Sequence, residues 1–152
     1  MDDFLFRGRL ADVDPDVAAL VDLETIRQTR RLIMIPSESS VPVSVREAVG
    51  SVFHNIYAEG YPTDESRSLT QAEILALDIR LAEYRRYSDA RYYKGTEFAD
   101  AIESLARRRA AELFATETIP ADQLWVNVQP LSGAPANNAV YSALLQPGDT
   151  IM

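Results

Sequence analysis

The sequence predicts an α/β protein in which helices cover a mainly parallel sheet. Two observations predict this class. Residues 97–152 alternate between helical and strand patterns, which is the order of elements that a parallel sheet requires. The last apolar run, Thr150–Met152, reads as a strand that is just beginning. We therefore expect N-terminal helices followed by the first strands of a sheet that is incomplete in these 152 residues.

Composition narrows the class of protein. The net charge of −8 argues against nucleic acid or an anionic membrane as a partner, and we interpret the basic run Arg107–Arg109 as the solvated face of a helix. No apolar run approaches the ~20 residues of a membrane span, and the acidic N-terminus has no signal-peptide core, so a cytoplasmic protein is expected. There is no cysteine and His54 is the only histidine, which excludes thiolate and multi-histidine metal sites.

Residues 1–43 read as an N-terminal helical arm. Asp14 is predicted to cap a helix that has Pro15 at its first position and runs to about Leu32. This helix is only partly apolar, so it is expected to pack on another subunit. The polar cluster Ser37–Ser40 lies between prolines and is predicted to be a loop.

Residues 44–62 are predicted to form a short helix and a loop. Ser44 and Glu47 fit a capping box, which predicts a helix from Val45 to about Phe53. The following segment Asn55–Pro62 carries two tyrosines, a glutamate and a glycine without a clean period. Aromatic and carboxylate groups on a loop are frequent in functional sites, although packing alone also explains such tyrosines.

Two further helices are predicted between residues 63 and 114. Residues 63–90 contain a second capping box, Thr70 with Glu73. The apolar stripe of this helix comprises Leu75, Ile79 and Ala82, broadened by Ile74, Leu77, Leu81 and Tyr84. Thr96 is predicted to cap a helix over Glu97–Phe114, with inward side chains Phe98, Ile102, Leu105, Leu113 and Phe114.

The segment Leu124–Asn138 is the strongest candidate for a ligand site. Leu124–Gln129 is a short apolar run that predicts a buried strand. Ser132 and Gly133 then open a helix predicted over Ala134–Leu145. The N–H groups of a first helical turn and the helix dipole favour a phosphate at such a position. An ordinary strand–helix unit without a ligand is the alternative, because one Ser-Gly is weaker than a full glycine-rich motif.

Five motifs occur together and in order: IRQTRRLIMIPSES, GSVFHNIYAEGYP, RYYKG, ELF and VNVQPLSGAPANNAVYSALLQPGDTI. With them the chain resembles serine hydroxymethyltransferase from about Glu24 to Met152. The resemblance implies a fold-type I, aminotransferase-like enzyme that uses pyridoxal 5'-phosphate to interconvert serine and glycine, with tetrahydrofolate as the one-carbon carrier. It also implies a dimer or tetramer with sites at the subunit interface, and residues 91–152 as the start of the cofactor-binding large domain.

Site roles follow from the resemblance at matching positions. Ser37 and Tyr57 match residues that hold the substrate carboxylate, and Glu59 matches the catalytic acidic residue that contacts folate and the substrate hydroxyl. Tyr92 and Tyr93 match a tyrosine pair near folate and substrate, respectively. The cofactor phosphate would be held by Ser132, Gly133 and Ala134. No metal is expected.

Several departures accompany the resemblance. Ala134 replaces a serine, Pro135 stands where glutamine is usual, Lys94 replaces a glycine, and residues 63–90 read as a helical insertion. The family's Schiff-base lysine, pyridine-facing aspartate and ring-stacking histidine all follow the position of Met152, and Lys94, the only lysine, lies in another motif. This chain alone is therefore expected to be inactive.

Three interpretations of these departures stay open. The first is the N-terminal part of the enzyme, completed by a complementary C-terminal chain. The second is a related pyridoxal-phosphate aldolase or transaldolase acting on β-hydroxy amino acids. The third is a non-catalytic assembly module with a vestigial site.

Overall fold

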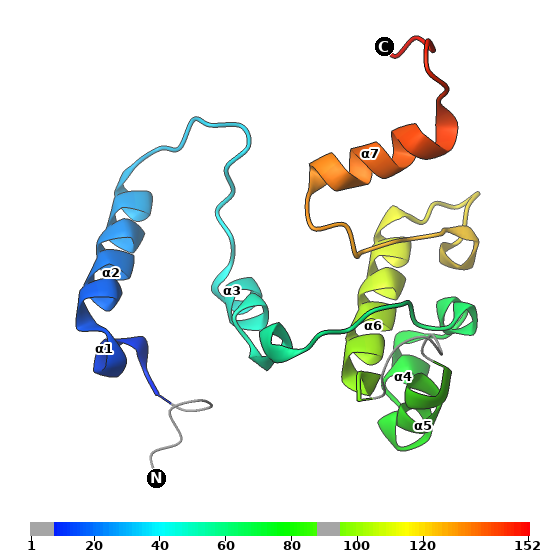
Figure 1. The fold of residues 1–152 in the computed structure, drawn as a ribbon, viewed down its shortest axis with the longest axis horizontal. Coiled ribbons are helices and arrows are strands. Elements are labelled where there is room, and N and C mark those ends of the chain that lie inside the picture. The colour runs from blue at the N-terminus through cyan, green and yellow to red at the C-terminus, as the bar shows by residue number, and fades with distance from the viewer. Residues whose placement is uncertain (1–7, 88–94) are drawn as a thin grey trace. The chain divides into compact units, whose positions relative to one another are not determined.

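The computed structural model describes residues 8–87 and 95–152, which divide between Ile56 and Tyr57 into two compact units (Figure 1). The first unit begins with helices α1, Leu10–Val13, and α2, Pro15–Arg30. It continues with helix α3, Val43–Val49, and the 3-10 helix η1, Val52–Asn55. None of the residues described in this unit is buried.

Helix α2 begins as the sequence predicts. The Asp14 side chain accepts a hydrogen bond from the backbone N–H of Val17 at 3.0 Å, and Pro15 is the first helical residue. The helix ends at Arg30 rather than near Leu32. The polar segment after it is a loop, as expected, with a turn in which the Glu38 N–H donates to the Ile35 carbonyl at 3.0 Å.

The capping box predicted at Ser44 is wrong. Helix α3 begins at Val43, so Ser44 lies within its first turn, and Pro42 is the N-cap without a side-chain cap bond. The helix ends at Val49, and Ser51 then caps η1 by accepting from the Phe53 N–H at 3.5 Å. Pro42 has an extended backbone with φ of −56° and ψ of 149°, and its carbonyl accepts from the Val45 and Arg46 N–H groups at 3.1 and 3.2 Å.

The described part of the second unit contains six helical elements. Three short elements precede the longest helix: η2, Asp64–Arg67, α4, Gln71–Ile74, and α5, Leu77–Tyr87. Helix α6 spans Glu97–Phe114, as predicted, and contacts all three. The 3-10 helix η3, Ala121–Gln123, and helix α7, Gly133–Leu144, follow.

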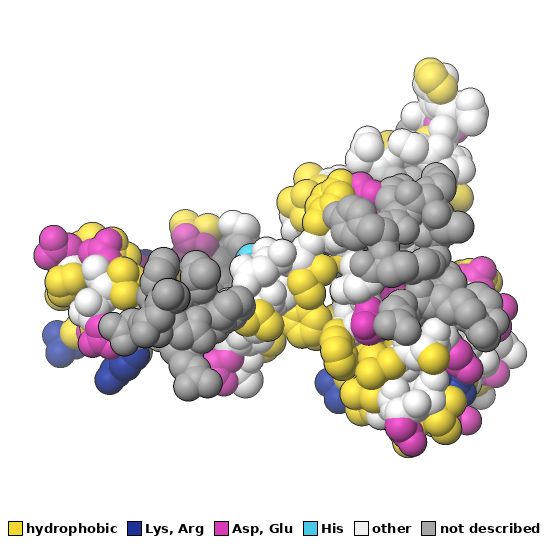
Figure 2. Space-filling view, turned by 60° about the horizontal axis from the view of Figure 1, so that its bottom comes forward, with side chains coloured by type: hydrophobic (Ala, Val, Ile, Leu, Met, Phe, Trp, Pro, Cys, Tyr) yellow, Lys and Arg dark blue, Asp and Glu magenta, His cyan; other side chains and the backbone are white. Residues whose placement is uncertain are grey.

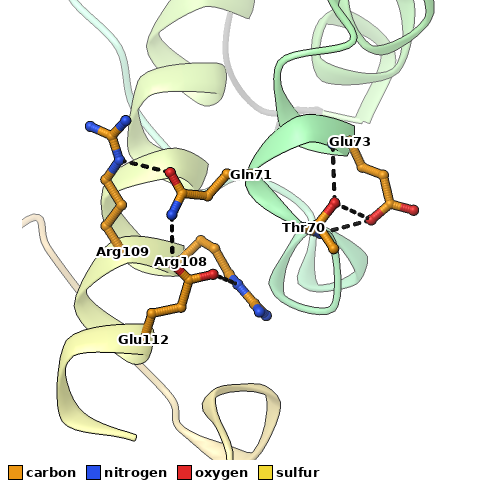
Figure 3. A network of polar contacts seen from close by, with 6 residues as sticks. All are labelled: Thr70, Gln71, Glu73, Arg108, Arg109 and Glu112. Atoms are coloured by element: carbon orange, nitrogen blue, oxygen red, sulfur yellow. Dashed lines mark hydrogen bonds and ion pairs between the residues drawn. The ribbon is translucent and has the colours of Figure 1, made fainter.

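The capping box at Thr70 is confirmed (Figure 3). The Thr70 hydroxyl accepts from the Glu73 N–H, while the Glu73 carboxylate accepts from the Thr70 N–H at 2.8 Å. The next residue, Gln71, reaches helix α6: its amide nitrogen donates to Glu112, and its amide oxygen accepts from Arg109 Nε at 3.0 Å. These contacts attach the start of α4 to the C-terminal half of α6.

The predicted apolar stripe of α4 and α5 is confirmed in part. Ile74 and Tyr84, which broaden this stripe, are the buried side chains among the described residues of the two helices, whereas Leu75, Ile79 and Ala82 at its centre are exposed. The Tyr84 hydroxyl donates to the Ile74 carbonyl at 3.2 Å across the break between the two helices. This break replaces the single helix expected from the capping box.

Helix α6 buries a polar face. Its buried residues are Asp100, Ala101, Ser104, Arg107 and Ala111, while the residues predicted to face inward, Phe98, Ile102, Leu113 and Phe114, are exposed and Leu105 is half-buried. Arg107 therefore does not belong to a solvated face as expected. Hydrophobic side chains lie at the surface of the described residues (Figure 2). Burial inside this unit thus does not follow hydropathy.

Neither expected strand forms within the described residues. Leu124–Gln129 is extended but pairs with no described strand, and the same holds for Thr150–Met152. An extended segment becomes a strand only through ladder hydrogen bonds to a neighbour, and the described residues offer none. One contact of this segment is made by the Arg67 guanidinium, which lies 3.2 Å from the centroid of the Trp125 ring. Trp125 is 70% exposed and not buried as the strand would require.

Helix α7 confirms the expected helix to within one residue at each end. It is followed by the predicted turn, in which the Asp149 N–H donates to the Gln146 carbonyl at 3.0 Å. Gly148 occupies the turn with φ of 102°, a conformation that glycine adopts without steric cost.

Candidate functional site

The loop after η1 brings two predicted site residues together. The Tyr57 hydroxyl donates a short hydrogen bond to Glu59 Oε1. Tyr57 is exposed and Glu59 is half-buried. A hydroxyl donor and a carboxylate are thus adjacent at the surface of the second unit, which is the pairing that binding and proton transfer at an amino acid require.

Gly60 fixes the shape of this loop. Its φ of 86° lies in the left-handed region, which a residue with a Cβ adopts only with strain. The Gly60 carbonyl accepts a hydrogen bond of 2.6 Å from Gln129 Nε2. The loop is therefore tied to the extended segment that leads into helix α7.

The same amide nitrogen of Gln129 also contacts helix α6. Gln129 Nε2 lies 3.1 Å from both carboxylate oxygens of Glu103. Burial raises the pKa of Glu103, and the hydrogen bond from Gln129 acts in the opposite direction. Gln129 thus stabilises the charged form of a carboxylate that its surroundings disfavour.

One turn earlier on α6, Asp100 is buried and its Oδ2 has no hydrogen-bond partner. The pKa of Asp100 is raised to about 6, mainly by burial and to a smaller extent by the nearby carboxylates of Glu103 and Glu97. The N-terminal half of α6 therefore carries the carboxylates of Glu97, Asp100 and Glu103. Burial disfavours the charged form of Asp100 and of Glu103.

The N-terminus of α7 is open. Ser132 is the N-cap with extended backbone, and its hydroxyl makes no capping bond to the described helix. The first backbone bond of the helix runs from the Ala136 N–H to the Ser132 carbonyl at 3.3 Å. This leaves the N–H groups of Gly133 and Ala134 ahead of the ladder, while Pro135 has none to offer.

These groups fit a phosphate. Ser132, Gly133 and Ala134 are all exposed, and a Cβ added at Gly133 would meet nothing within 4 Å, so the backbone there is accessible. Two backbone N–H groups and one uncommitted hydroxyl at a helix N-terminus form an anion site of the kind that helix dipoles favour. Ser132, Gly133 and Ala134 could therefore hold an anion such as phosphate through two backbone donors and a hydroxyl, and this cradle stays a prediction.

The structure does not test the remaining predicted residues. Ser37 lies in the first unit, on the exposed turn that follows Ile35. Tyr92, Tyr93 and Lys94 lie outside the described residues. The structure thus joins the loop of Tyr57 and Glu59 to the segment before Ser132, through a residue that the sequence did not single out.

Gln129 and Glu103 are the residues that sequence reasoning missed. Gln129 is 69 positions from Gly60 and 26 from Glu103. The one local signal was a polar side chain at the end of an apolar run, just before Pro130. A polar side chain is common at the end of a strand, so this signal does not identify the partners of Gln129.

The described residues contain neither a membrane-spanning helix nor a cluster of metal ligands. No described helix has the length and apolar character needed to cross a lipid bilayer. Among residues 8–87 and 95–152, no group of three or more His, Cys, Asp or Glu side chains is placed to hold a metal ion.

Comparison with known proteins gives one family. The family described as serine hydroxymethyltransferase matches residues 10–85 and 65–152. The serine hydroxymethyltransferase of Acidobacterium capsulatum is 46% identical over 143 residues, which are 94% of this chain and 26% of that protein. Those of Kocuria rhizophila and Bifidobacterium adolescentis are 45% and 41% identical, over 94% and 97% of this chain and 26% and 27% of their own lengths.

The chain spans about a quarter of the length of these curated relatives. No solved structure gives a significant match.

Proposed function

The chain belongs to the serine hydroxymethyltransferase family, and we propose that it forms the N-terminal part of a pyridoxal-phosphate-dependent enzyme that interconverts serine and glycine with tetrahydrofolate. Membership of this family implies a fold-type I domain, whose parallel sheet is part of the proposal. The observation that carries the functional proposal is the loop of Tyr57 and Glu59, bound through Gly60 to the segment that opens into the α7 N-terminus.

Each part of this geometry has a chemical use in such a reaction. The Tyr57 hydroxyl, which now donates to Glu59, would donate instead to the carboxylate of a bound amino acid, and Glu59 could then move a proton at the substrate hydroxyl. The N–H groups of Gly133 and Ala134, with the Ser132 hydroxyl, would hold the cofactor phosphate. Pyridoxal phosphate, when bound, supplies the electron sink. Ser37, Tyr92 and Tyr93 remain proposed contacts of substrate and folate.

The proposed enzyme requires residues that this chain does not contain. Lys94 is the only lysine, and its motif is not the one that carries the Schiff-base lysine in the resemblance. We therefore place the remaining groups on further polypeptide, in an oligomer of two or four subunits or on a complementary chain. A cytoplasmic location is part of the same proposal.

A chimaeric enzyme tests the proposal. This chain replaces the matching quarter of the Acidobacterium capsulatum enzyme, to which it is 46% identical. We expect tetrahydrofolate-dependent conversion of serine to glycine, measured by the one-carbon unit transferred. The matched control carries Glu59→Gln and should bind pyridoxal phosphate but turn over far more slowly.

Two results would count against the proposal. A folded chimaera that binds pyridoxal phosphate yet transfers no one-carbon unit from serine would support the assembly module with a vestigial site. A chimaera that cleaves β-hydroxy amino acids with no dependence on tetrahydrofolate would instead favour the aldolase.

A further inference from the structure

The side-chain amide of Gln129 bridges two segments that are distant in sequence. Gln129 Nε2 lies 2.6 Å from the Gly60 carbonyl oxygen and 3.1 Å from each carboxylate oxygen of Glu103. An amide NH₂ group carries two hydrogens. One of them can point to the Gly60 carbonyl while the other is shared between the two Glu103 oxygens, so a single nitrogen serves both contacts.

The chemistry of these partners explains why the residue is a glutamine. A carbonyl and a carboxylate are both acceptors, so the group between them must donate in two directions. A glutamate at this position would offer no hydrogen when ionised and would face Glu103 with a like charge. A leucine would keep the approximate shape and offer no hydrogen at all.

The contact from Gln129 links this loop to a distant part of the chain. The bond between Tyr57 and Glu59 is local, since the two residues are only two positions apart, and it cannot by itself attach the loop to the helices. Gly60 has a φ of 86° and both Tyr57 and Tyr61 are exposed. The hydrogen bond from Gln129 supplies an attachment to the rest of the unit, directly beside Glu59.

We propose that Gln129 is a positioning residue, which holds the loop of Tyr57 and Glu59 through the Gly60 carbonyl and sets its place relative to the N-terminus of α7. Gln129 and Ser132 are three residues apart, a span of at most about 10 Å of extended chain. One residue thus restrains both halves of the candidate site. The role of Gln129 in the reaction rests on the proposed function. The restraint that Gln129 places on the loop does not depend on that function.

Hydrogen–deuterium exchange of the full chain tests the restraint without any activity. The readout is the exchange rate of the loop peptide around Tyr57–Tyr61 in three variants. Glu103→Gln keeps the donor to Gly60, so exchange should stay close to that of the wild type. Gln129→Glu removes the donor and adds repulsion, so exchange should become about tenfold faster, which corresponds to one lost hydrogen bond at the upper end of the usual range.

The double variant Glu103→Gln with Gln129→Glu gives the decisive comparison. In it the amide at position 103 can donate to the carboxylate at position 129, so this contact returns in reversed sense, while the Gly60 carbonyl still has no donor. We therefore expect the amides of the loop peptide to exchange as fast as they do in Gln129→Glu. Gln123→Glu, which adds the same charge at an exposed position of η3, is the matched control and should leave the loop unchanged.

Two outcomes would overturn the inference. Wild-type exchange in Gln129→Glu would mean that the bond to Gly60 does not restrain the loop. Recovery in the double variant would mean that only the packing of residue 129 on α6 matters.

The chimaera then tests the role in the reaction. We expect kcat/KM for serine to fall about tenfold in Gln129→Glu and in the double variant, mainly through KM, but not in Glu103→Gln. Unchanged kinetics with a fast loop would overturn the positioning role. An inactive chimaera with the wild-type chain would contradict the proposed function, and the exchange experiment would still decide whether the restraint exists.

Discussion

Substitutions of Tyr57 and Glu59, two nearby residues of the loop, should change different kinetic parameters. In the chimaeric enzyme, Glu59→Gln keeps the size of the side chain but removes the base, so kcat should fall on the order of 10²-fold or more while pyridoxal phosphate still binds. Tyr57→Phe removes one hydroxyl that could bind a charged carboxylate, a loss of about 1.5–3 kcal/mol that should raise KM for serine.

The hydrogen bond between the two side chains adds a condition to this prediction. Because residues in contact are not independent, the double variant should lose less than the sum of the two single losses. Steady-state kinetics of the four proteins gives the coupling. Strict additivity would show that the contact between Tyr57 and Glu59 is absent from the working enzyme.

Asp100 provides a prediction about pH. Its pKa is raised from 3.8 to about 6 in the folded protein, mainly by burial and further by Glu103 and Glu97. Between these two pH values the folded state holds more protons than the unfolded state, so the free energy of unfolding falls as the pH rises from about 4 to 6. The side chain of Asp100→Asn cannot ionise, so this contribution to the fall in the free energy of unfolding should be absent from the variant.

Urea denaturation at several pH values measures the difference. The stability of Asp100→Asn relative to the wild type should grow through this range to ~2–3 kcal/mol at pH 7. Asp78→Asn, at an exposed position of α5, controls for the loss of a negative charge. A constant difference at all pH values would show that Asp100 acts through packing and not through its charge.

At the scale of single residues, the sequence located the loop of Tyr57 and Glu59 and the Ser132–Gly133 turn, but it did not connect them. The connection depends on Gln129, whose partners are far away in the chain. Side-chain contacts between distant segments are set by the packing of helices, and local patterns carry no information about that packing.

At the scale of the elements, the clearest prediction concerns the N-cap of α4. Thr70 exchanges two capping contacts with Glu73, and α4 is attached to α6 immediately after them. Thr70→Ala should reduce the stability of the chain by ~1 kcal/mol, the typical cost of losing an N-cap hydroxyl. Thermal or urea unfolding measures it, and Thr70→Ser, which keeps the hydroxyl, is the matched control.

Equal melting of Thr70→Ala and Thr70→Ser would refute a stabilising role for this cap. A second comparison comes from Ser44, which has the same sequence signature but lies inside α3. Ser44→Ala should have no destabilising effect, since alanine has the higher helix propensity.

Helix limits were more predictable than helix faces. The ends of α2, α6 and α7 carry local signals, such as proline at a first position, and these signals were read correctly to within about two residues. The inward face of α6 was wrong because its apolar stripe is exposed in this chain. The expected strands did not form in the described residues because a strand needs a neighbour, and a pattern within one segment cannot supply it.

The molecule as a whole presents apolar helix faces to solvent. Examples among the described residues are Leu20 and Leu23 on α2, Phe98 and Leu113 on α6, and Val140 and Leu144 on α7. Burying one such side chain is worth about 1.5–3 kcal/mol. The isolated chain should therefore associate, either with itself or with polypeptide that covers these faces.

Sedimentation velocity over a range of concentrations tests this prediction. Leu113→Glu and Leu144→Glu, each at a strongly exposed position, should weaken association about tenfold or more. Asp78→Asn, which alters charge without adding to an apolar face, should not. A monomer that stays compact at high concentration would contradict the prediction.

The absorbance of the isolated chain with pyridoxal phosphate is a further property of the whole molecule. With Lys94 as the only lysine, and with that lysine in a motif of another role, the chain should develop no stable visible absorbance band on addition of the cofactor. A band that disappears in Lys94→Ala would show that Lys94 is the reactive residue after all.

The stacking of Arg67 on Trp125 has an optical consequence. Trp125 is the only tryptophan of the chain, so the ultraviolet emission of the whole protein at long excitation wavelength originates from the ring that the guanidinium covers. The other side of that ring is open to water. If residues 124–129 detach from η2, the wavelength and intensity of this emission should therefore change. The extended segment before the α7 N-terminus thus carries its own fluorophore, and Arg67→Ala provides the reference spectrum for its detached state.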